Sequence, residues 1–192
     1  MKKILLSFAI FSVFVFMIPP TLMAADQPPK VGDPLPDLSL TIPKDNADKT
    51  YLGISGSGSF KIAQLKAQVV ILEIFSMYCP FCQKEAPIVN KLYETIEAKS
   101  NLHGKIKIIG IAAGNSDYEA DVFRKKYSVP FPLIPDADYE VYNKIGGAVR
   151  TPYFIVVRLN SDGTNRIVYT KLGALGDIGV FLQEIIESAG LR

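Results

Sequence analysis

Two buried-strand patterns, each followed by a helical pattern, leave few folds open to this chain. Residues 69–75 form an apolar, β-branched run broken by one acid, and residues 106–113 form a second apolar run. Such runs are typical of strands buried on both faces of a sheet. Residues 84–98 and 118–127 place apolar side chains at helical spacing. Strand, helix, strand and helix in this order predict crossover units and a parallel sheet core.

The last third of the chain has a different pattern. Residues 153–159 and 167–171 are expected to form two strands of a hairpin, because a loop rich in Asn, Asp and Gly joins them. Asp177 can cap a last amphipathic helix. The side chains expected to face the core from this helix are Val180, Phe181, Ile185 and Ile186. The predicted fold class is therefore α/β, a central mixed β-sheet flanked by helices.

The N-terminus has the three parts of a secretory signal. Lys2 and Lys3 precede an apolar run over 4–18, and the small residues Ala24 and Ala25 follow before the chain turns polar. The apolar run is shorter than the roughly 20 residues that a membrane-spanning helix needs. We expect residues 1–25 to be a signal peptide, with an uncleaved anchor as the alternative. The protein would then be periplasmic or otherwise extracytoplasmic, and soluble once the signal is removed.

The remaining residues, 26–192, have the length and composition of one globular domain. Residues 27–36 are rich in proline, so the segment 26–50 is expected to be an extended N-terminal arm. Without Lys2 and Lys3, the 21 basic residues fall to 19, which balances the 19 acidic residues. This balance indicates neither a nucleic acid nor an anionic membrane surface as a partner. We expect a monomer.

The chain contains two cysteines, Cys79 and Cys82, with only Pro80 and Phe81 between them. A structural disulfide closing so short a loop would stabilise the fold little, so the spacing favours redox chemistry. If Cys79 caps the helix that follows, the unpaired backbone N–H groups at the start of that helix and the helix dipole favour the thiolate form of Cys79. Cys79 is then the nucleophile, and Cys82, one turn further on, is the resolving thiol.

Four further segments of the sequence are informative, and they are residues 31–36 (VGDPLP), 64–66 (QLK), 76–82 (SMYCPFC) and 151–154 (TPYF). With these segments the chain resembles the thioredoxin superfamily, most closely its exported TlpA/ResA-like thiol-disulfide oxidoreductases of the redoxin or AhpC/TSA kind. The resemblance implies a thioredoxin-like fold with an N-terminal extension, and a redox-active disulfide between Cys79 and Cys82 with no other cofactor.

This resemblance also implies an activity, which is thiol-disulfide exchange on exported proteins. The expected direction is that of a disulfide reductase that serves cytochrome c biogenesis or cell redox homeostasis and receives electrons from a membrane partner. Two features depart from the family pattern. Tyr78 stands where tryptophan is usual, and the Pro80-Phe81 pair is nearer to glutaredoxins. These departures leave the reduction potential and the direction of electron flow open.

Further site residues follow from the same resemblance. Glu73, six residues before the first cysteine, matches the buried acid of thioredoxin, which implies a proton relay to Cys82. The alternative is an edge strand with Glu73 in solvent. Thr151 and Pro152 resemble the cis-proline loop that holds an extended substrate. The flanking side chains of Tyr78 and Phe81 are expected to be exposed and to bind a partner protein. The substrate-binding set is therefore Tyr78, Phe81, Thr151 and Pro152.

Two other functions remain open at this stage. A peroxiredoxin-like thiol peroxidase is one, because Ser76 stands three residues before Cys79 and Arg150 could pair with its thiolate. A copper-binding or other metal-binding module without turnover is the second, because two thiolates can hold copper(I). His103 is the only histidine and lies far from the cysteines along the chain, so no metal site is predicted.

Overall fold

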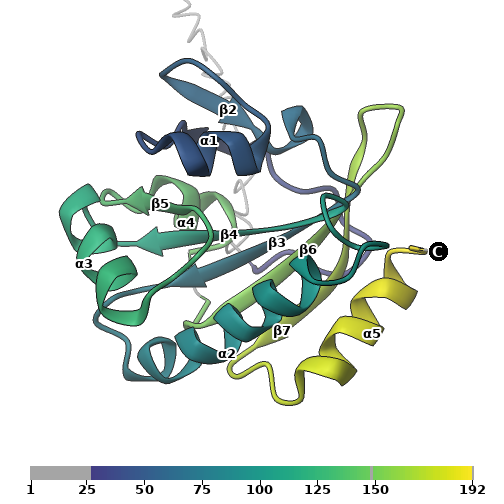
Figure 1. The fold of residues 1–192 in the computed structure, drawn as a ribbon. Helices are drawn as coiled ribbons and strands as arrows, with labels where there is room; N and C mark the ends of the chain where they lie inside the picture. The colour runs from purple at the N-terminus through teal and green to yellow at the C-terminus, as the bar shows by residue number, and fades with distance from the viewer. Residues whose placement is uncertain (1–26, 148, 192) are drawn as a thin grey trace, which may run out of the picture.

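The computed structural model describes residues 27–147 and 149–191, and it is built around a five-stranded sheet. The strand order is β5-β4-β3-β6-β7 (Figure 1). The β3, β4 and β5 strands are parallel, whereas β6 and β7 run antiparallel to their neighbours. The bounds are β3 Val69–Phe75, β4 Ile106–Ala113, β5 Leu133–Asp136, β6 Tyr153–Leu159 and β7 Asn165–Leu172. The predicted mixed α/β fold is confirmed.

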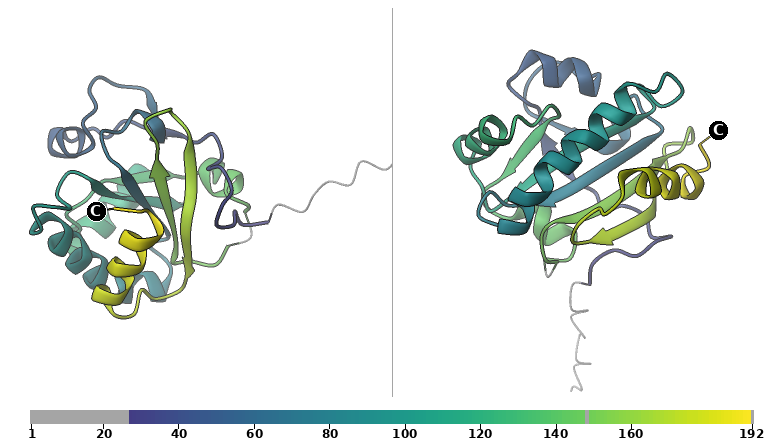
Figure 2. Two further views of the ribbon diagram at one scale, coloured as in Figure 1. Left: turned by 90° about the vertical axis from the view of Figure 1, so that its right-hand side faces the viewer. Right: turned by 60° about the horizontal axis from the view of Figure 1, so that its bottom comes forward.

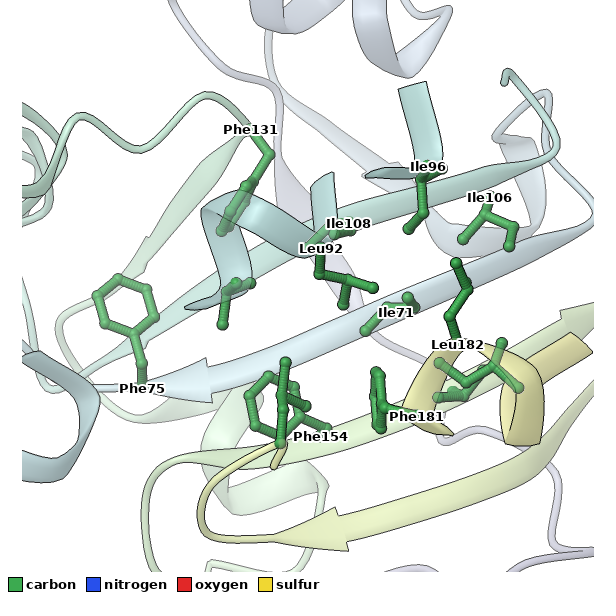
Figure 3. Close-up of a cluster of buried hydrophobic side chains, with 14 of the residues drawn as sticks. Ile71, Phe75, Leu92, Ile96, Ile106, Ile108, Phe131, Phe154, Phe181 and Leu182 are labelled. Carbon is green, nitrogen blue, oxygen red and sulfur yellow. The ribbon is translucent and has the colours of Figure 1, made fainter. Parts of the chain in front are cut away.

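Helices cover both faces of this sheet. Helices α2 (Pro80–Glu97) and α5 (Ile178–Ser188) lie side by side on one face (Figure 2), and α3 (Asp117–Tyr127) contributes to the same apolar cluster. Figure 3 shows the centre of that cluster, where aromatic and branched side chains of the strands meet α2 and α5. The other face is covered by α1 (Asn46–Leu52), α4 (Glu140–Lys144) and the hairpin of β1 (Ser39–Thr41) and β2 (Ser59–Lys61), with a short 3₁₀ turn at Ile62–Gln64.

The sheet brings two distant segments of the chain together. Every residue of β3 is buried, and Ile74 near its end lies opposite Tyr153 at the beginning of antiparallel β6. The loop that leaves β3 and the loop that enters β6 therefore meet at the same edge of the sheet. These are the loops 76–79 and 150–152, which contain the predicted nucleophile and the predicted cis-proline.

The N-terminal segment is less extended than the sequence suggested. Backbone bonds pair Gly32 and Asp33 with Ile167 of the edge strand β7. The expectation of an extended arm as far as residue 50 is wrong in its last part, because α1 begins at Asn46. The side chain of Asp45 caps this helix by accepting from the backbone N–H of Ala47 at 2.6 Å. A seven-residue helix has too short an apolar pattern to be recognised from spacing.

The predicted signal peptide, residues 1–25, lies outside the described residues. Within the ranges that are described, no helix is both long enough and apolar enough to cross a membrane.

The buried stripe of α5 differs from the prediction at one position. Phe181, Leu182 and Ile185 are buried and Ile186 is partly buried, but Val180 is 56% exposed. The prediction that Val180 faces the core is wrong. The buried stripe of α5 includes Leu182, and the side chain of Val180 points away from that stripe.

This correction can be tested with two matched truncations. We expect Leu182→Ala to lower the free energy of unfolding by about 2–5 kcal/mol, because it leaves a cavity in the core. Val180→Ala should change it by less than about 0.5 kcal/mol, because the side chain is mostly in solvent. Urea denaturation measures both values. Equal losses would show that the stripe has been placed wrongly.

Candidate active site

Cys79 is the N-cap residue of α2. Its backbone is extended, its sulfur accepts from the N–H of Cys82 at 3.5 Å, and Pro80 occupies the first helical position. The N–H of Cys79 also donates to the backbone oxygen of Ser76, which closes a tight turn after β3. The predicted cap is therefore confirmed, and the sulfur of Cys79 lies at the positive end of the helix dipole.

The two thiols are in unlike surroundings. Cys79 is partly exposed, whereas Cys82 is fully buried, and both are free thiols in this structure. Burial opposes ionisation of Cys79, but hydrogen bonds from the Thr151 side chain and the backbone N–H groups of Cys82 and Phe81 outweigh it and lower its pKa. Burial raises the pKa of Cys82 to about 12. The outer thiol therefore ionises first.

The loop before β6 lies against the outer thiol. The Thr151–Pro152 peptide bond is cis, as the resemblance implied. In its protonated form the thiol of Cys79 donates to the backbone oxygen of Thr151 at 3.3 Å. Because Pro152 is buried and its oxygen accepts from the N–H of Gly173, this loop is held from both sides next to Cys79.

Glu73 lies in the centre of the sheet. It stands in β3 between β4 and β6 and is only 4% exposed, so the alternative of an edge strand with Glu73 in solvent is wrong. Successive side chains of a strand alternate between faces, and Ile71 and Phe75 pack in the cluster under α2. Glu73 therefore points to the face that α2 covers. Burial, with a smaller contribution from the charge of Glu85, raises its pKa to about 8.

A second buried acid was missed by the sequence analysis. Glu85 is 3% exposed and follows Cys82 by one helical turn, and its Oε1 accepts from the backbone N–H of Leu175 at 2.7 Å. The signal was present in the sequence, since Glu85 precedes Val89 by four residues and lies on the apolar stripe of its helix. Two buried carboxyl groups, of Glu73 and Glu85, thus lie near each other between the sheet and α2.

Exposed aromatic side chains flank Cys79, as expected. Tyr78 is 65% exposed and Phe81 is 70% exposed. The hydroxyl of Tyr78 donates to the carboxylate of Glu119 in α3. Next to it, Tyr118 is also exposed, at 75%. This surface is open to a partner protein.

The residues invoked for the other functions have different contacts. The hydroxyl of Ser76 accepts from the side chain of Asn115 at 3.4 Å. Arg150 is exposed, and in the described part of the chain it makes no hydrogen bond to Cys79. His103 pairs with Glu97 at 2.9 Å, at the far end of α2. A helix of 18 residues spans about 27 Å, so His103 is too far away to join the thiols at one metal ion.

This chain is similar to proteins named thiol-disulfide oxidoreductase ResA. It is 27% identical to ResA of Oceanobacillus iheyensis over an aligned segment of 128 residues, and this segment covers 66% of this chain and 59% of that protein. It is also 27% identical over 81 residues to ResA of Bacillus subtilis, which covers 42% of each chain. The chain therefore spans less than two thirds of the length of these relatives.

Solved structures share its fold. A thiol:disulfide interchange protein of the thioredoxin family from Chlorobium tepidum matches with a TM-score of 0.57 and 18% identity, over 84% of this chain and 99% of that one. A secreted Mycobacterium tuberculosis disulfide oxidoreductase matches with a TM-score of 0.54 and 21% identity, over 79% and 96%. The predicted thioredoxin-like fold is therefore confirmed. Residues 31–162, more than half of the sequence, match the AhpC/TSA family, and the chain belongs to that family.

Proposed function

We propose that this protein is a thiol-disulfide oxidoreductase that reduces disulfides of exported proteins through Cys79 and Cys82. One observation carries the proposal. The partly exposed thiol of Cys79 at the start of α2 has a lowered pKa, and the buried thiol of Cys82, with a raised pKa, lies one turn behind it. This is the asymmetry that separates an attacking thiol from a resolving one. The names of the ResA relatives support the same activity.

The proposed reaction proceeds by two exchanges. The Cys79 thiolate attacks one sulfur of a substrate disulfide, which breaks the substrate S–S bond, forms a mixed disulfide and releases the other sulfur as a thiolate that takes up a proton. Cys82 then loses its proton and attacks the sulfur of Cys79. The mixed disulfide breaks, the second substrate thiol leaves, and Cys79 and Cys82 are joined. Two electrons thus pass from the dithiol to the substrate.

Glu73 is the proposed proton acceptor for the second step. Cys82 has to lose a proton although burial destabilises its thiolate and raises its pKa. A carboxyl group with a pKa of about 8 on the α2 face of β3 can hold or release a proton near neutral pH. Glu85, fixed by its bond to Leu175, adds a second acid to this buried layer.

The surroundings of the cysteine pair suit a protein substrate. Thr151 contacts Cys79 beside the cis peptide, and the exposed rings of Tyr78 and Phe81 offer apolar surface. We further propose that residues 1–25 direct export, that the protein acts as a monomer, and that a membrane protein returns electrons to the oxidised pair. Its substrates would include proteins of cytochrome c maturation.

The direction of electron flow is tested by the reduction potential of the Cys79–Cys82 pair. We expect a value nearer to the roughly −270 mV of thioredoxin than to the roughly −120 mV of a strong periplasmic oxidant. Equilibration with redox buffers, followed by trapping of free thiols, measures it. A value near that of the strong oxidant would reject the reductase. Faster turnover of hydrogen peroxide than of a protein disulfide would instead favour the peroxidase.

A further inference from the structure

The loop that carries Cys79 is held at a single peptide unit. The backbone N–H of Met77 donates to Oδ1 of Asn115 at 2.8 Å. The backbone oxygen of the same residue accepts from Nε2 of Gln83 at 2.7 Å. Both polar groups of Met77 are thus bound by side chains, one from the junction of β4 and α3 and one from α2. We call this arrangement of Asn115, Gln83 and Met77 the loop clamp.

Asn115 is built into the clamp from all sides. It is 0% exposed, and its Nδ2 donates to the backbone oxygen of Gly114 at 2.9 Å and to the hydroxyl of Ser76 at 3.4 Å. With two acceptors on the nitrogen, the amide oxygen is directed at Met77. Asn115 and Met77 are 38 residues apart in sequence. The sheet places their two loops near each other, and the side chain of Asn115 then joins the loops by a hydrogen bond.

The clamped segment touches both thiols. The oxygen of Ser76 accepts from the N–H of Cys79 at 3.1 Å, and the backbone of Ser76 forms a hydrogen bond with the sulfur of Cys82. Gln83, the other arm of the clamp, directly follows Cys82, and its N–H donates to the oxygen of Cys79 at 3.0 Å. A shift of the Met77 peptide would therefore move the surroundings of both sulfurs.

We propose that Asn115 and Gln83 are positioning residues that hold the Met77 peptide, so that Cys79 caps α2 and lies against Thr151. This inference rests on the proposed function of the cysteine pair. Among the described residues, neither side chain forms a hydrogen bond with the sulfur of Cys79 or Cys82. They act through the loop, which has no other side-chain bond to the backbone of Met77 among the described residues.

A partly buried asparagine that joins two elements is available as a control. Nδ2 of Asn90, in α2, donates to the backbone oxygens of Tyr127 and Ser128 at 2.8 and 3.3 Å. It ties α2 to the end of α3, away from the cysteines. Asn90→Ala therefore removes the same kind of side-chain-to-backbone bond as Asn115→Ala, without touching the clamp.

The experiment compares Asn115→Ala, Gln83→Ala, their combination and Asn90→Ala in the full chain. We expect the pH midpoint of Cys79 alkylation to rise by about 0.7 in each clamp variant, which lowers the alkylation rate below that midpoint about fivefold. Because both side chains hold the same peptide unit, the shift of the alkylation midpoint in the double variant should be smaller than the sum of the shifts in the two single variants. Asn90→Ala should lose stability while it keeps the wild-type midpoint and reduction potential.

Three outcomes would decide the proposal. The proposal would be overturned if both single clamp variants kept the wild-type pH midpoint of Cys79 alkylation and the wild-type reduction potential. If these variants also kept their exchange activity, the proposed function would still stand. Gln83 is only partly buried, so Gln83→Ala should fold even if Asn115→Ala does not. In that case, an unchanged alkylation midpoint in Gln83→Ala would overturn the proposal. A wild-type protein without exchange would reject the proposed function, whereas shifted alkylation midpoints would still support the clamp.

Discussion

Replacing Cys79 with serine should abolish exchange with protein disulfides, a loss of at least about 1,000-fold in rate. A serine hydroxyl is not ionised near neutral pH, and its oxygen cannot form the mixed disulfide that the reaction requires. Cys82 cannot take over the attack, because it is fully buried and its pKa is raised to about 12. Reduction of insulin disulfides, monitored by turbidity with a thiol donor, measures the loss.

Cys82→Ser is the matched control, because it should fail at a different step. Cys79 remains able to attack, so the first exchange proceeds and a mixed disulfide accumulates with no internal thiol to resolve it. Non-reducing gels should then show a covalent adduct between this variant and a disulfide substrate. The same gels should show none with Cys79→Ser. Adducts that form only through Cys82 would reverse the two roles.

Replacing Glu73 with glutamine should make the stability of the protein less sensitive to alkaline pH, and the effect should be large. The pKa of Glu73 lies at about 8 in the folded protein, compared with 4.5 for an exposed glutamate. An unfolded chain therefore releases this proton before the folded protein does. In wild type the stabilisation is complete below pH 4.5 and is lost as pH rises to about 8. Glutamine cannot ionise, so the variant escapes this loss.

The expected size follows from the same two values. Between about pH 5 and pH 9, wild type should lose about 4 kcal/mol of unfolding free energy relative to Glu73→Gln. Urea unfolding at a series of pH values measures the difference. Glu94→Gln is the control, because Glu94 lies exposed on α2 and, among the residues that the structure describes, forms an ion pair only with Lys91. This variant should follow the wild-type curve. A Glu73→Gln curve parallel to wild type would mean that Glu73 is charged in the folded protein.

The same variant should also separate the two steps of exchange. If Glu73 accepts the proton of Cys82, the glutamine variant should form mixed disulfides at the wild-type rate and resolve them more slowly. The first exchange should be unaffected, because Cys79 makes its hydrogen bonds with Thr151 and with the start of α2.

The centre of this fold could be predicted because its signals are local. β3 and β4 are contiguous apolar segments, and their burial follows from that pattern alone. The cap by Cys79 follows from a short-range arrangement of residues at a strand-to-helix junction. The cis bond at Pro152 came from the family resemblance and not from spacing, since most X-Pro bonds are trans.

What could not be predicted depends on contacts between distant segments. Asn115 stands in a polar loop, and nothing in its surroundings along the chain indicates that it binds Met77 across 38 residues. The position of Glu85 on the apolar stripe of α2 could be read from spacing, but its partner could not, because the N–H of Leu175 lies 90 residues later in the chain. In α5 only Val180 was misplaced, because Val180 and Leu182 are both apolar and only packing distinguishes them.

The ionisation of Cys79 is tested most directly by alkylating the reduced protein over a range of pH and locating the label by peptide mapping. We predict a single modified residue, Cys79, with a midpoint below the roughly 8.5 of a free cysteine, and no label on Cys82 in the folded protein. Two thiols that react at the same rate, with the midpoint of free cysteine, would contradict the account.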